Sequence, residues 1–305
     1  MRTYNAAQKR YLDFCACYTL CALPAPEDTM LLYVAYLHKE GLKASSVKVY
    51  IAAVRALHIE AGYGNPMEGY LRLQRAIRAL EINSDPPKQK LPITIQIMNQ
   101  LYDVVGNDYN SRVTWAAMSL GYFGCLRAAE FCVTQHRFDP RVNLTMADLA
   151  INATQGINEI HASFRIKRSK TDKSNKGFQL YIACTRKNVC GYCAVIQMLQ
   201  ARRSSGLPMD DSLPLFMYSN GAALTRTQFV TQTRLLLATL GYNTSSYSGH
   251  SYRAGSATTA AANGLPDWQI KLLGRWNSDA YHRYVRASVQ TVLQFSKLLC
   301  ENIKG

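Results

Sequence analysis

Two tyrosines, Tyr281 and Tyr284, lie three residues apart in the basic segment GRWNSDAYHRYVR, residues 274–286. A phenol has a pKa of about 10, so it attacks a phosphate at neutral pH only if cations stabilise its phenolate or a base takes its proton. The arginines and the histidine of this segment could supply such groups. The segment therefore indicates either a phosphoryl-transfer nucleophile or a solvated basic helix, because both would have this composition.

Cleavage of a phosphodiester without a metal needs fixed cations around the phosphate, an aligned nucleophile and a proton for the leaving oxygen. Arg127 is a candidate cation because it lies in the apolar stretch LGYFGCLRAAEFCV, where an unpaired charge would be costly to bury. We expect one long, mostly buried helix over residues 112–132, which would place Glu130 on the same face. The pair indicates a guanidinium oriented for a ligand, or a purely structural ion pair.

A second pair of candidates, His250 and Arg253, comes from the sequence GHSYR. If Ser248 caps a helix that continues through AGSATTAAANG, both side chains lie on one helical face. The small residues 254–257 predict that this helix packs closely against another segment. A histidine and an arginine at a helix start are also common surface groups, so this motif alone does not decide between the two readings.

Lys170 lies in RSKTDKSNKG, a predicted hairpin turn from which its ammonium could reach a leaving oxygen. By spacing alone Lys167, Lys173 and Lys176 compete with it, and any of these lysines could simply touch a polyanion. Trp276 carries one N–H donor that could bind a phosphate oxygen, although core packing is the commoner role of such a ring.

Hydrophobic periodicity predicts the elements that would position these residues. Helices are expected over 47–62 and 69–82, the second capped by Asn65-Pro66, and then over 94–105, 112–132, 193–203 and 225–240. The segments ADLAI, EIHASFRIK and FQLYIAC alternate with period two and predict three antiparallel strands. INSDPPKQKLP, residues 82–92, has the composition of a linker. The predicted fold is therefore mainly α with a small antiparallel β-sheet (α+β), in domains 1–85 and 86–305.

Charge and cysteine content narrow the function classes. The net charge is +15, of which +13 falls in residues 86–305, and this favours a polyanionic partner such as nucleic acid. The most apolar window, residues 113–126, is too short to span a bilayer, and no signal peptide is recognisable. Nine cysteines without framework spacing indicate a reduced compartment. Cys190 and Cys193 form a single CxxC, for which packing or loop roles are favoured over zinc, so no metal site is predicted.

Taken in order, Arg…Lys…His-x-x-Arg…Trp…Tyr resembles the tyrosine recombinase family, which includes phage integrases and bacterial chromosome-dimer resolvases. The segment LGHSYRAGSATTAAANGLPDWQIKLLGRWNSDAYHRYVR looks most like recombinases of eukaryotic DIRS-like and Crypton-like mobile elements. SSVKVYIAAVRALHIEAG resembles the family's helical core-binding domain, and GCLRAAEF and RSKTD resemble its first-arginine helix and its lysine hairpin. The resemblance implies a core-binding domain over 1–85 and a catalytic domain over 86–305 that ends in a packing helix.

The resemblance implies a site-specific recombinase or integrase of a mobile element. In that chemistry a tyrosine attacks a DNA phosphodiester, forms a 3′-phosphotyrosyl link and frees a 5′-hydroxyl, with no metal and no cofactor. The implied catalytic residues are Arg127, Lys170, His250, Arg253, Trp276 and Tyr284, with Glu130 behind them.

The spacing of the tyrosine departs from the pattern of many phage and bacterial members. There the tyrosine follows the His/Trp position by nine residues, whereas here Tyr284 follows Trp276 by eight and Tyr281 follows it by five. The RYVR context favours Tyr284 as the nucleophile, which leaves Tyr281 as a packing residue.

The resemblance also implies partners and a location. Double-stranded DNA is the expected ligand, bound by a homo-oligomer, a tetramer on two sites, with no membrane partner. Candidate DNA-contacting residues are Lys43, Lys48, Arg55, Arg72, Arg75, Lys173 and Lys176. A eukaryotic element would place the protein in the nucleus, and any other source would place it in the cytoplasm with DNA. A type IB topoisomerase and a domesticated DNA-binding regulator that no longer cleaves are the alternatives.

Overall fold

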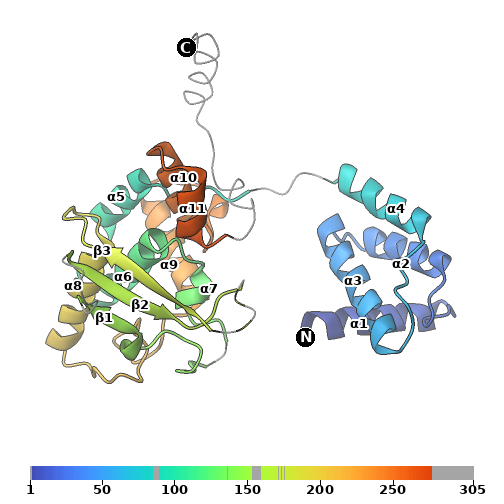
Figure 1. Cartoon of the computed structure of the whole chain (residues 1–305), viewed down its shortest axis with the longest axis horizontal. Helices are drawn as coiled ribbons and strands as arrows, with labels where there is room; N and C mark the ends of the chain where they lie inside the picture. Colours follow the sequence, from blue (N-terminus) through green and yellow to red (C-terminus); the bar gives the residue numbers. More distant parts are fainter. Residues whose placement is uncertain are drawn as a thin grey trace, which may run out of the picture. The chain divides into compact units, whose positions relative to one another are not determined.

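The structure is a computed structural model that describes residues 2–84, 89–135, 137–152, 159–170, 172, 174 and 176–276 (Figure 1). The chain forms two compact units that divide between Lys88 and Gln89, each with its own hydrophobic core. This division lies three residues beyond the boundary predicted at 85/86. Within the described ranges, no helix is long and apolar enough to cross a membrane.

The first unit, over its described residues 2–84, contains four helices: α1 (Arg2–Cys17), α2 (Glu27–Lys39), α3 (Ala44–Glu60) and α4 (Leu71–Ile82). Apolar residues at helical spacing meet in one core, where the rings of Tyr11 and Tyr33 pack edge to face with centroids 5.0 Å apart. Leu37 and Val54 are fully buried in the same core. At about 1.5–3 kcal/mol for each buried large apolar side chain, this core is the main stabilising contribution to the unit.

Helix α4 begins later than its sequence predicted. Asn65 accepts a hydrogen bond from the Met67 amide, 3.1 Å, within a separate turn, and Gly69 then takes a left-handed conformation (φ +83°) that a helix cannot continue through. The real cap comes from another helix, because the carboxylate of Glu27 accepts from the backbone amides of Arg72 and Leu73, 2.8 and 3.1 Å. Local sequence could not reveal this cap, since it is 45 residues away.

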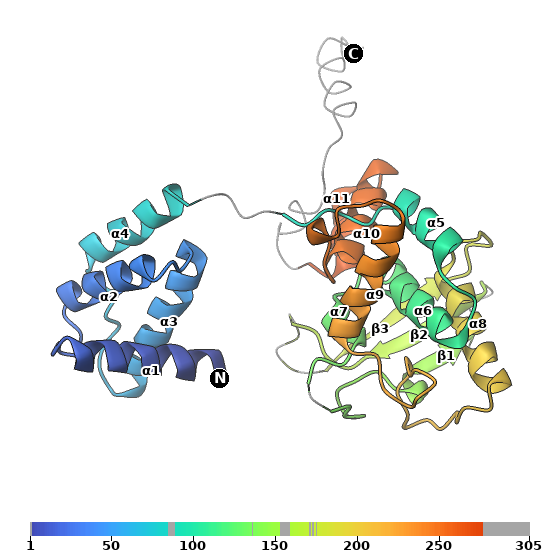
Figure 2. The same ribbon diagram turned by 180° about the vertical axis from the view of Figure 1, so that it is seen from behind.

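The second unit contains most of the helices and the sheet (Figures 1 and 2). Its helices are α5 (Ile95–Val104), α6 (Tyr109–Phe123), α7 (Ala128–Phe131), η1 (Met146–Asp148), α8 (Gly191–Ser204), α9 (Arg226–Thr239), η2 (Thr244–Ser246), α10 (Ser251–Ala262) and α11 (Asp267–Gly274). Strands β1 (Leu149–Ile151), β2 (His161–Ile166) and β3 (Phe178–Ala183) form one antiparallel sheet in the order β1-β2-β3. The predicted fold class is confirmed.

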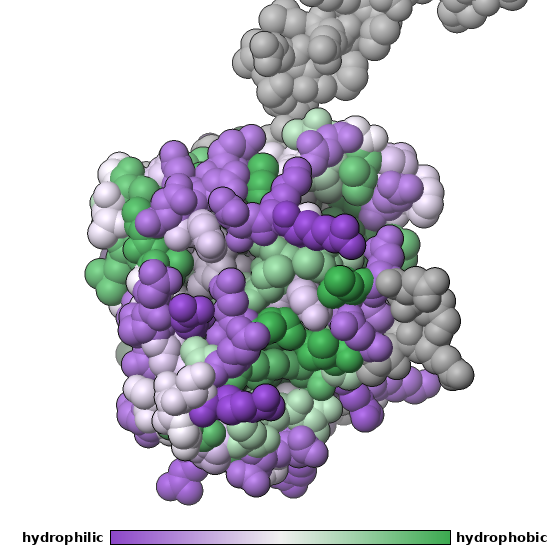
Figure 3. Space-filling model, turned by 90° about the vertical axis from the view of Figure 1, so that its left-hand side faces the viewer, coloured by the Kyte–Doolittle hydropathy of each residue, from purple (hydrophilic) through white to green (hydrophobic). Residues whose placement is uncertain are grey.

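Alternation along β3 shows how the sheet meets the core. Leu180 and Ile182 are buried, whereas Tyr181 between them is 56% exposed. Strand β2 is buried over most of its length, as expected for the central strand. The core centres on α6, whose buried residues include Trp115. Seen from the side on which α8 and α5 lie, the surface is mostly hydrophilic, with a large hydrophobic area near its centre and smaller ones towards its edges (Figure 3).

The single helix predicted over 112–132 is wrong, because α6 ends at Phe123 and a tight turn separates it from α7. Cys125 takes a left-handed conformation (φ 47°) in this turn, and the amide of Leu126 donates back to the carbonyl of Gly121. A Cβ at Gly124 would lie 2.8 Å from both the Leu120 carbonyl oxygen and the side chain of Leu180. The apolar periodicity hid this break, since both sides of the turn are buried.

The close packing predicted for residues 254–257 is confirmed. A Cβ added at Gly255 would lie 1.6 Å from the carbonyl oxygen of Ile93, so only glycine allows α10 to approach this backbone. The amides of Leu91 and Ile93 donate to the carbonyls of Ser246 and Ser251, 2.8 and 2.9 Å. The last residues of the predicted linker therefore lie against the second unit.

Candidate functional site

Arg127 lies at the N-terminus of the short helix α7 rather than inside a long helix. Its backbone amide donates to Glu130 Oε2, 2.8 Å, and its guanidinium donates to Glu130 Oε1, 2.9 Å. The side chain of Glu130 is only 2% exposed, and that of Arg127 is 18% exposed. Ser169 donates to Glu130 Oε1 as well, 2.8 Å. The carboxylate thus holds one edge of the guanidinium in a fixed orientation.

Arg253 lies in the first turn of α10 and is fully buried. One of its terminal nitrogens donates to the carbonyl of Cys125, 2.6 Å, and the other donates to the carbonyl of Gly274. Its guanidinium carbon lies 4.3 Å from the centroid of the Trp276 ring. Burial lowers the pKa of Arg253, and the positive charge of Arg127 adds to this effect. Its Nε has no hydrogen-bond partner among the described residues.

Arg275 is a site residue that the sequence reasoning missed. It ends α11 in a left-handed conformation (φ 54°) and donates to the carbonyls of Gly124 and Cys125, both 3.2 Å. Its guanidinium carbon lies 4.2 Å from the centroid of the Phe178 ring. Burial lowers its pKa, and the charge of Arg127 acts on it in the same direction. The sequence did offer one signal for it, because Arg275 is a charged residue directly before the predicted site residue Trp276.

His250 directly precedes α10, which begins at Ser251 and not at the predicted cap Ser248. Instead the Ser251 hydroxyl accepts from the Ser248 amide, 2.9 Å. The His250 side chain is exposed, yet partial burial of its ring lowers its pKa. The charges of Arg226, Arg127, Arg253 and Lys170 lower the pKa further. The imidazole is therefore biased towards its neutral form, which can accept a proton.

The lysines of the hairpin are not equivalent. Lys167 is held by Asp148, 2.6 Å from its carboxylate, and by the carbonyl of Pro140, so it is a structural ion pair. Lys170 is exposed, and the residue before it, Ser169, accepts a hydrogen bond from Arg127, 3.4 Å. Of the two hairpin lysines Lys167 and Lys170, it is therefore Lys170 that lies near Arg127 and whose charge acts on His250.

These residues form one group, which we call the cationic cluster: Arg127, Lys170, His250, Arg253 and Arg275. They come from the start of α7, the hairpin after β2, the start of α10 and the end of α11, which are far apart in sequence. The carboxylate of Glu130 is engaged by Arg127 and Ser169, so it compensates only part of this charge. Such an arrangement is suited to bind an anion with several fixed donors. Trp276 forms one wall through its contact with Arg253.

Several predicted residues lie elsewhere or outside the described residues. Tyr281, Tyr284 and Lys173 are outside the described ranges, and Lys176 is exposed after the hairpin. In the first unit, Arg72 pairs with Glu27 and Asp28 and Lys48 pairs with Glu81 at distances of 2.5–2.9 Å. The other basic candidates of this unit are exposed: Lys43, Arg55 and Arg75.

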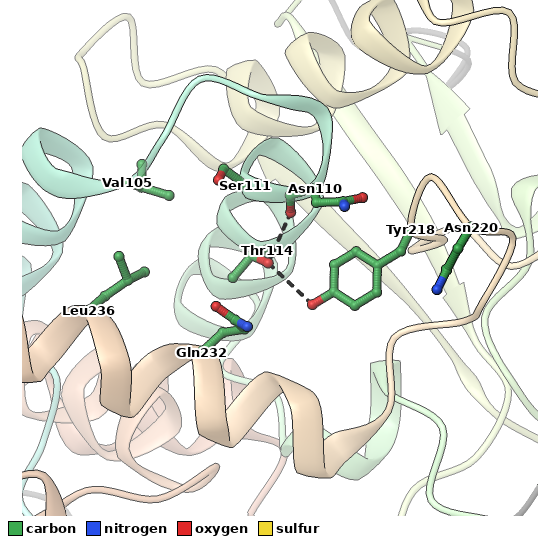
Figure 4. Close-up of a pocket in the computed structure, with 8 residues that line it drawn as sticks. All are labelled: Val105, Asn110, Ser111, Thr114, Tyr218, Asn220, Gln232 and Leu236. Carbon is green, nitrogen blue, oxygen red and sulfur yellow. Dashed lines mark hydrogen bonds between the residues drawn. The ribbon is translucent and has the colours of Figure 1, made fainter.

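A pocket in the second unit does not coincide with the cationic cluster. It is lined by residues of α6 and α9 and by the loop that carries Tyr218 (Figure 4). The Thr114 hydroxyl lies 3.4 Å from the Tyr218 hydroxyl, and Thr114 also donates to the carbonyl of Asn110, 3.0 Å. The lining contains no member of the cationic cluster and no charged side chain. The pocket therefore lacks the fixed positive charges of the cationic cluster.

Known proteins resemble this chain in both sequence and fold, although no family model matches it. An integrase/recombinase xerD homolog of Selenomonas ruminantium is 23% identical over 292 residues, which cover 93% of this chain and 80% of the relative. The Tn1549 transposon integrase in complex with circular intermediate DNA matches with a TM-score of 0.53 at 14% identity, over 89% of this chain and 85% of that chain. The XerH recombinase bound to palindromic difH substrate matches with a TM-score of 0.51 at 14% identity, over 83% and 70%.

These likenesses define the class of protein: the chain has the tyrosine recombinase fold. A relative of 23% identity, the integrase/recombinase xerD homolog, extends over nearly the whole chain, so the sequence likeness covers both units. The resemblance predicted from the motif order is confirmed at this level. The closeness to eukaryotic DIRS-like and Crypton-like elements stays a prediction.

Proposed function

We propose that the protein is a site-specific DNA recombinase that cleaves and rejoins DNA through a covalent tyrosine intermediate. The observation that carries the proposal is the cationic cluster, in which the residues assigned to phosphate binding from motif order meet in space. DNA binding is supported by the likeness to the Tn1549 integrase and XerH, whose structures contain DNA. The net charge of +15 has the matching sign.

The proposed reaction is an in-line displacement at phosphorus. The phenolic oxygen of Tyr284 forms the new bond to phosphorus, and its proton goes to the neutral imidazole of His250. The bond to the 5′-oxygen breaks, and Lys170 donates the proton that makes a 5′-hydroxyl. The same steps in reverse, with the 5′-hydroxyl of a partner duplex as the attacking group, release the tyrosine and join the strands.

The arginines stabilise the negative charge that develops on the phosphate oxygens. Arg127 is held on one edge by Glu130, and the buried Arg253 donates to the carbonyls of Cys125 and Gly274, so both guanidiniums are fixed before the substrate arrives. Preorganised donors of this kind cost no reorganisation during reaction, and removal of one costs about 10²–10³-fold in rate. We propose that this stabilisation of the phosphate charge by the arginines supplies the larger part of the rate enhancement.

The position of Arg275 can account for the unusual spacing of eight residues between Trp276 and Tyr284. Tyr284 follows Arg275 by nine residues and Trp276 by eight. We propose that Arg275 takes a donor role at the phosphate beside Arg253, while Trp276 packs against Arg253 and closes the wall. Two adjacent residues would then share the work that one histidine or tryptophan performs in the resembling families.

Further features of the proposal come from the resemblance. The protein would serve a mobile element, with transposition or integration as its outcome, and would act as a tetramer on two duplexes. The Tn1549 integrase is a transposon protein, which supports the mobile-element context. Nuclear location would follow from a eukaryotic DIRS-like or Crypton-like origin. In the first unit we propose that the exposed Lys43, Arg55 and Arg75 contact the DNA backbone.

The DNA sequence that the protein recognises is identified in the first step of the test. A Tyr284→Phe variant first selects bound duplexes from the DNA that flanks the gene, and nicked versions of these duplexes then serve as suicide substrates. We expect wild-type protein and Tyr281→Phe to form a denaturant-resistant adduct with DNA and Tyr284→Phe to form none.

Three outcomes would contradict the proposal. Specific binding without any adduct would favour the DNA-binding regulator. Relaxation of a supercoiled plasmid by a monomer, without joining of two sites, would favour a type IB topoisomerase. An adduct that forms with Tyr284→Phe but not with Tyr281→Phe would overturn the assignment of the nucleophile.

A further inference from the structure

Three cysteines meet at the far end of strand β3 from the lysine hairpin. Cys184 directly follows β3, Cys190 caps the N-terminus of α8, and Cys193 lies in the first turn of that helix. The sulfur of Cys184 lies 3.7 Å from that of Cys193 and 3.9 Å from that of Cys190, and all three lie within 4.8 Å of one another. We call this group the trithiol cluster.

The sulfur spacing matches that of ligands around one metal ion. Zinc binds thiolates at about 2.3 Å in tetrahedral geometry, which places two sulfurs on one ion about 3.8 Å apart. The distances from the Cys184 sulfur to those of Cys193 and Cys190 agree with this value. Among the described residues, this is the only group of three or more metal-binding side chains whose ligand atoms come so close.

The surroundings of Cys190 favour a thiolate. Its sulfur accepts hydrogen bonds from the backbone amides of Thr185, 3.3 Å, and Cys193, 3.4 Å. Hydrogen bonds from backbone amides stabilise a negatively charged sulfur relative to a neutral one. Two fixed N–H donors therefore favour a thiolate at this position, which is the form of cysteine that binds a metal ion.

The solvent exposure of the trithiol cluster, and its difference from the other cysteines, also favour a metal site. Cys184 and Cys193 are half-buried, so an ion can reach them. By comparison, Cys125 and Cys132 are buried singly, and burial raises the pKa of both thiols. Those two behave as packing residues, whereas the trithiol cluster gathers side chains from two elements at one point.

We propose that Cys184, Cys190 and Cys193 bind one thiophilic divalent cation of the zinc class, with water or a small ligand in the fourth position. Binding forms three metal–sulfur bonds and releases to solvent the protons of those thiols that are not yet ionised. The ion would fasten the end of β3 to the start of α8. The role is structural and independent of the proposed DNA cleavage.

The test uses the full-length protein, reduced, stripped with a chelator and titrated with Co²⁺ as a spectroscopic substitute for zinc. We expect thiolate-to-cobalt charge-transfer and tetrahedral visible bands that saturate at one equivalent and disappear when Zn²⁺ is added. Cys184→Ser should weaken binding by more than about 100-fold. The double variant Cys17→Ser/Cys21→Ser, which removes two exposed thiols of the first unit, should bind like wild type.

Native mass spectrometry of the wild-type chain gives a second measurement that needs no variant. We expect a mass increase of one zinc with the loss of the displaced protons. Two results would overturn the proposal: a wild-type chain that binds no Co²⁺ or Zn²⁺ under reducing conditions, or bands that the Cys17→Ser/Cys21→Ser protein loses and Cys184→Ser keeps.

Discussion

Replacement of Glu130 by glutamine tests how the cationic cluster is held. The carboxylate accepts three hydrogen bonds, from the Arg127 amide, the Arg127 guanidinium and the Ser169 hydroxyl, at 2.8–2.9 Å. Glu130→Gln keeps the shape of the side chain but removes the charge, and its NH₂ group must face at least one of these donors. The substitution therefore removes charge-assisted hydrogen bonds and places the glutamine NH₂ group against a buried donor that then has no acceptor.

The magnitude follows from these contacts. Hydrogen bonds to a charged group contribute about 1.5–3 kcal/mol, and an unsatisfied buried donor costs about 1–3 kcal/mol. We expect Glu130→Gln to lower the free energy of unfolding of the second unit by about 3 kcal/mol. At about 2–4 °C per kcal/mol for a domain of this size, the melting temperature should fall by about 6–12 °C. Because Arg127 loses its orientation, adduct formation should slow by about 10²-fold.

Tryptophan fluorescence suits the assay, since the three tryptophans all belong to the second unit: Trp115, Trp268 and Trp276. Thermal and urea unfolding of wild type, Glu130→Gln and Glu159→Gln would be compared. Glu159 is an exposed glutamate of the same unit and controls for the loss of one negative charge. A melting temperature for Glu130→Gln no lower than that of Glu159→Gln would refute the reasoning.

Three further predictions concern neighbouring features. Arg275→Lys keeps the charge but loses the planar fork, so we expect adduct formation to slow by about 10²-fold, and an unchanged rate would remove Arg275 from the site. Because the pKa of His250 is lowered, its imidazole should stay neutral in the folded protein at pH values just below the ordinary midpoint of about 6.5. The unfolded chain binds the proton first, so the folded state should lose stability as the pH falls below about 6.5. An NMR titration midpoint at or above about 6.5 in the free protein would contradict this. Gly255→Ala places a Cβ against the carbonyl of Ile93 and should destabilise the second unit by more than about 2 kcal/mol, whereas Gly64→Ala, whose Cβ meets nothing within 4 Å, should change little; equal unfolding curves would disprove the close contact.

Sequence reasoning predicted well wherever periodicity and composition carry the signal. The three strands, the alanine-rich helix α10 and the close packing of that helix follow from alternation, helical spacing and small residues. The pair Arg127 and Glu130 was also found, because a charge in an apolar stretch needs a partner. The single long helix predicted to carry this pair was wrong, because the buried residue Cys125 takes a left-handed conformation and ends the helix without any polar residue to signal the break.

The remaining features depend on contacts between distant residues. Glu27 caps α4 from another helix, and no local pattern at residues 65–70 reports it. Arg275 reaches the site only because α11 ends in a left-handed turn beside Cys125. Cys184 joins the CxxC of α8 only once β3 and α8 are placed, which is why one pair alone indicated packing.

The measurement that tests the central claim most directly is the identification of the peptide that carries DNA. Wild-type adduct from the suicide substrate would be digested with protease and nuclease and analysed by tandem mass spectrometry. We predict a nucleotide attached through a 3′-phosphate to Tyr284, in a peptide from the segment HRYVR. Attachment to Tyr281 or to any other residue, or a cleaved product with no attached peptide, would contradict the account.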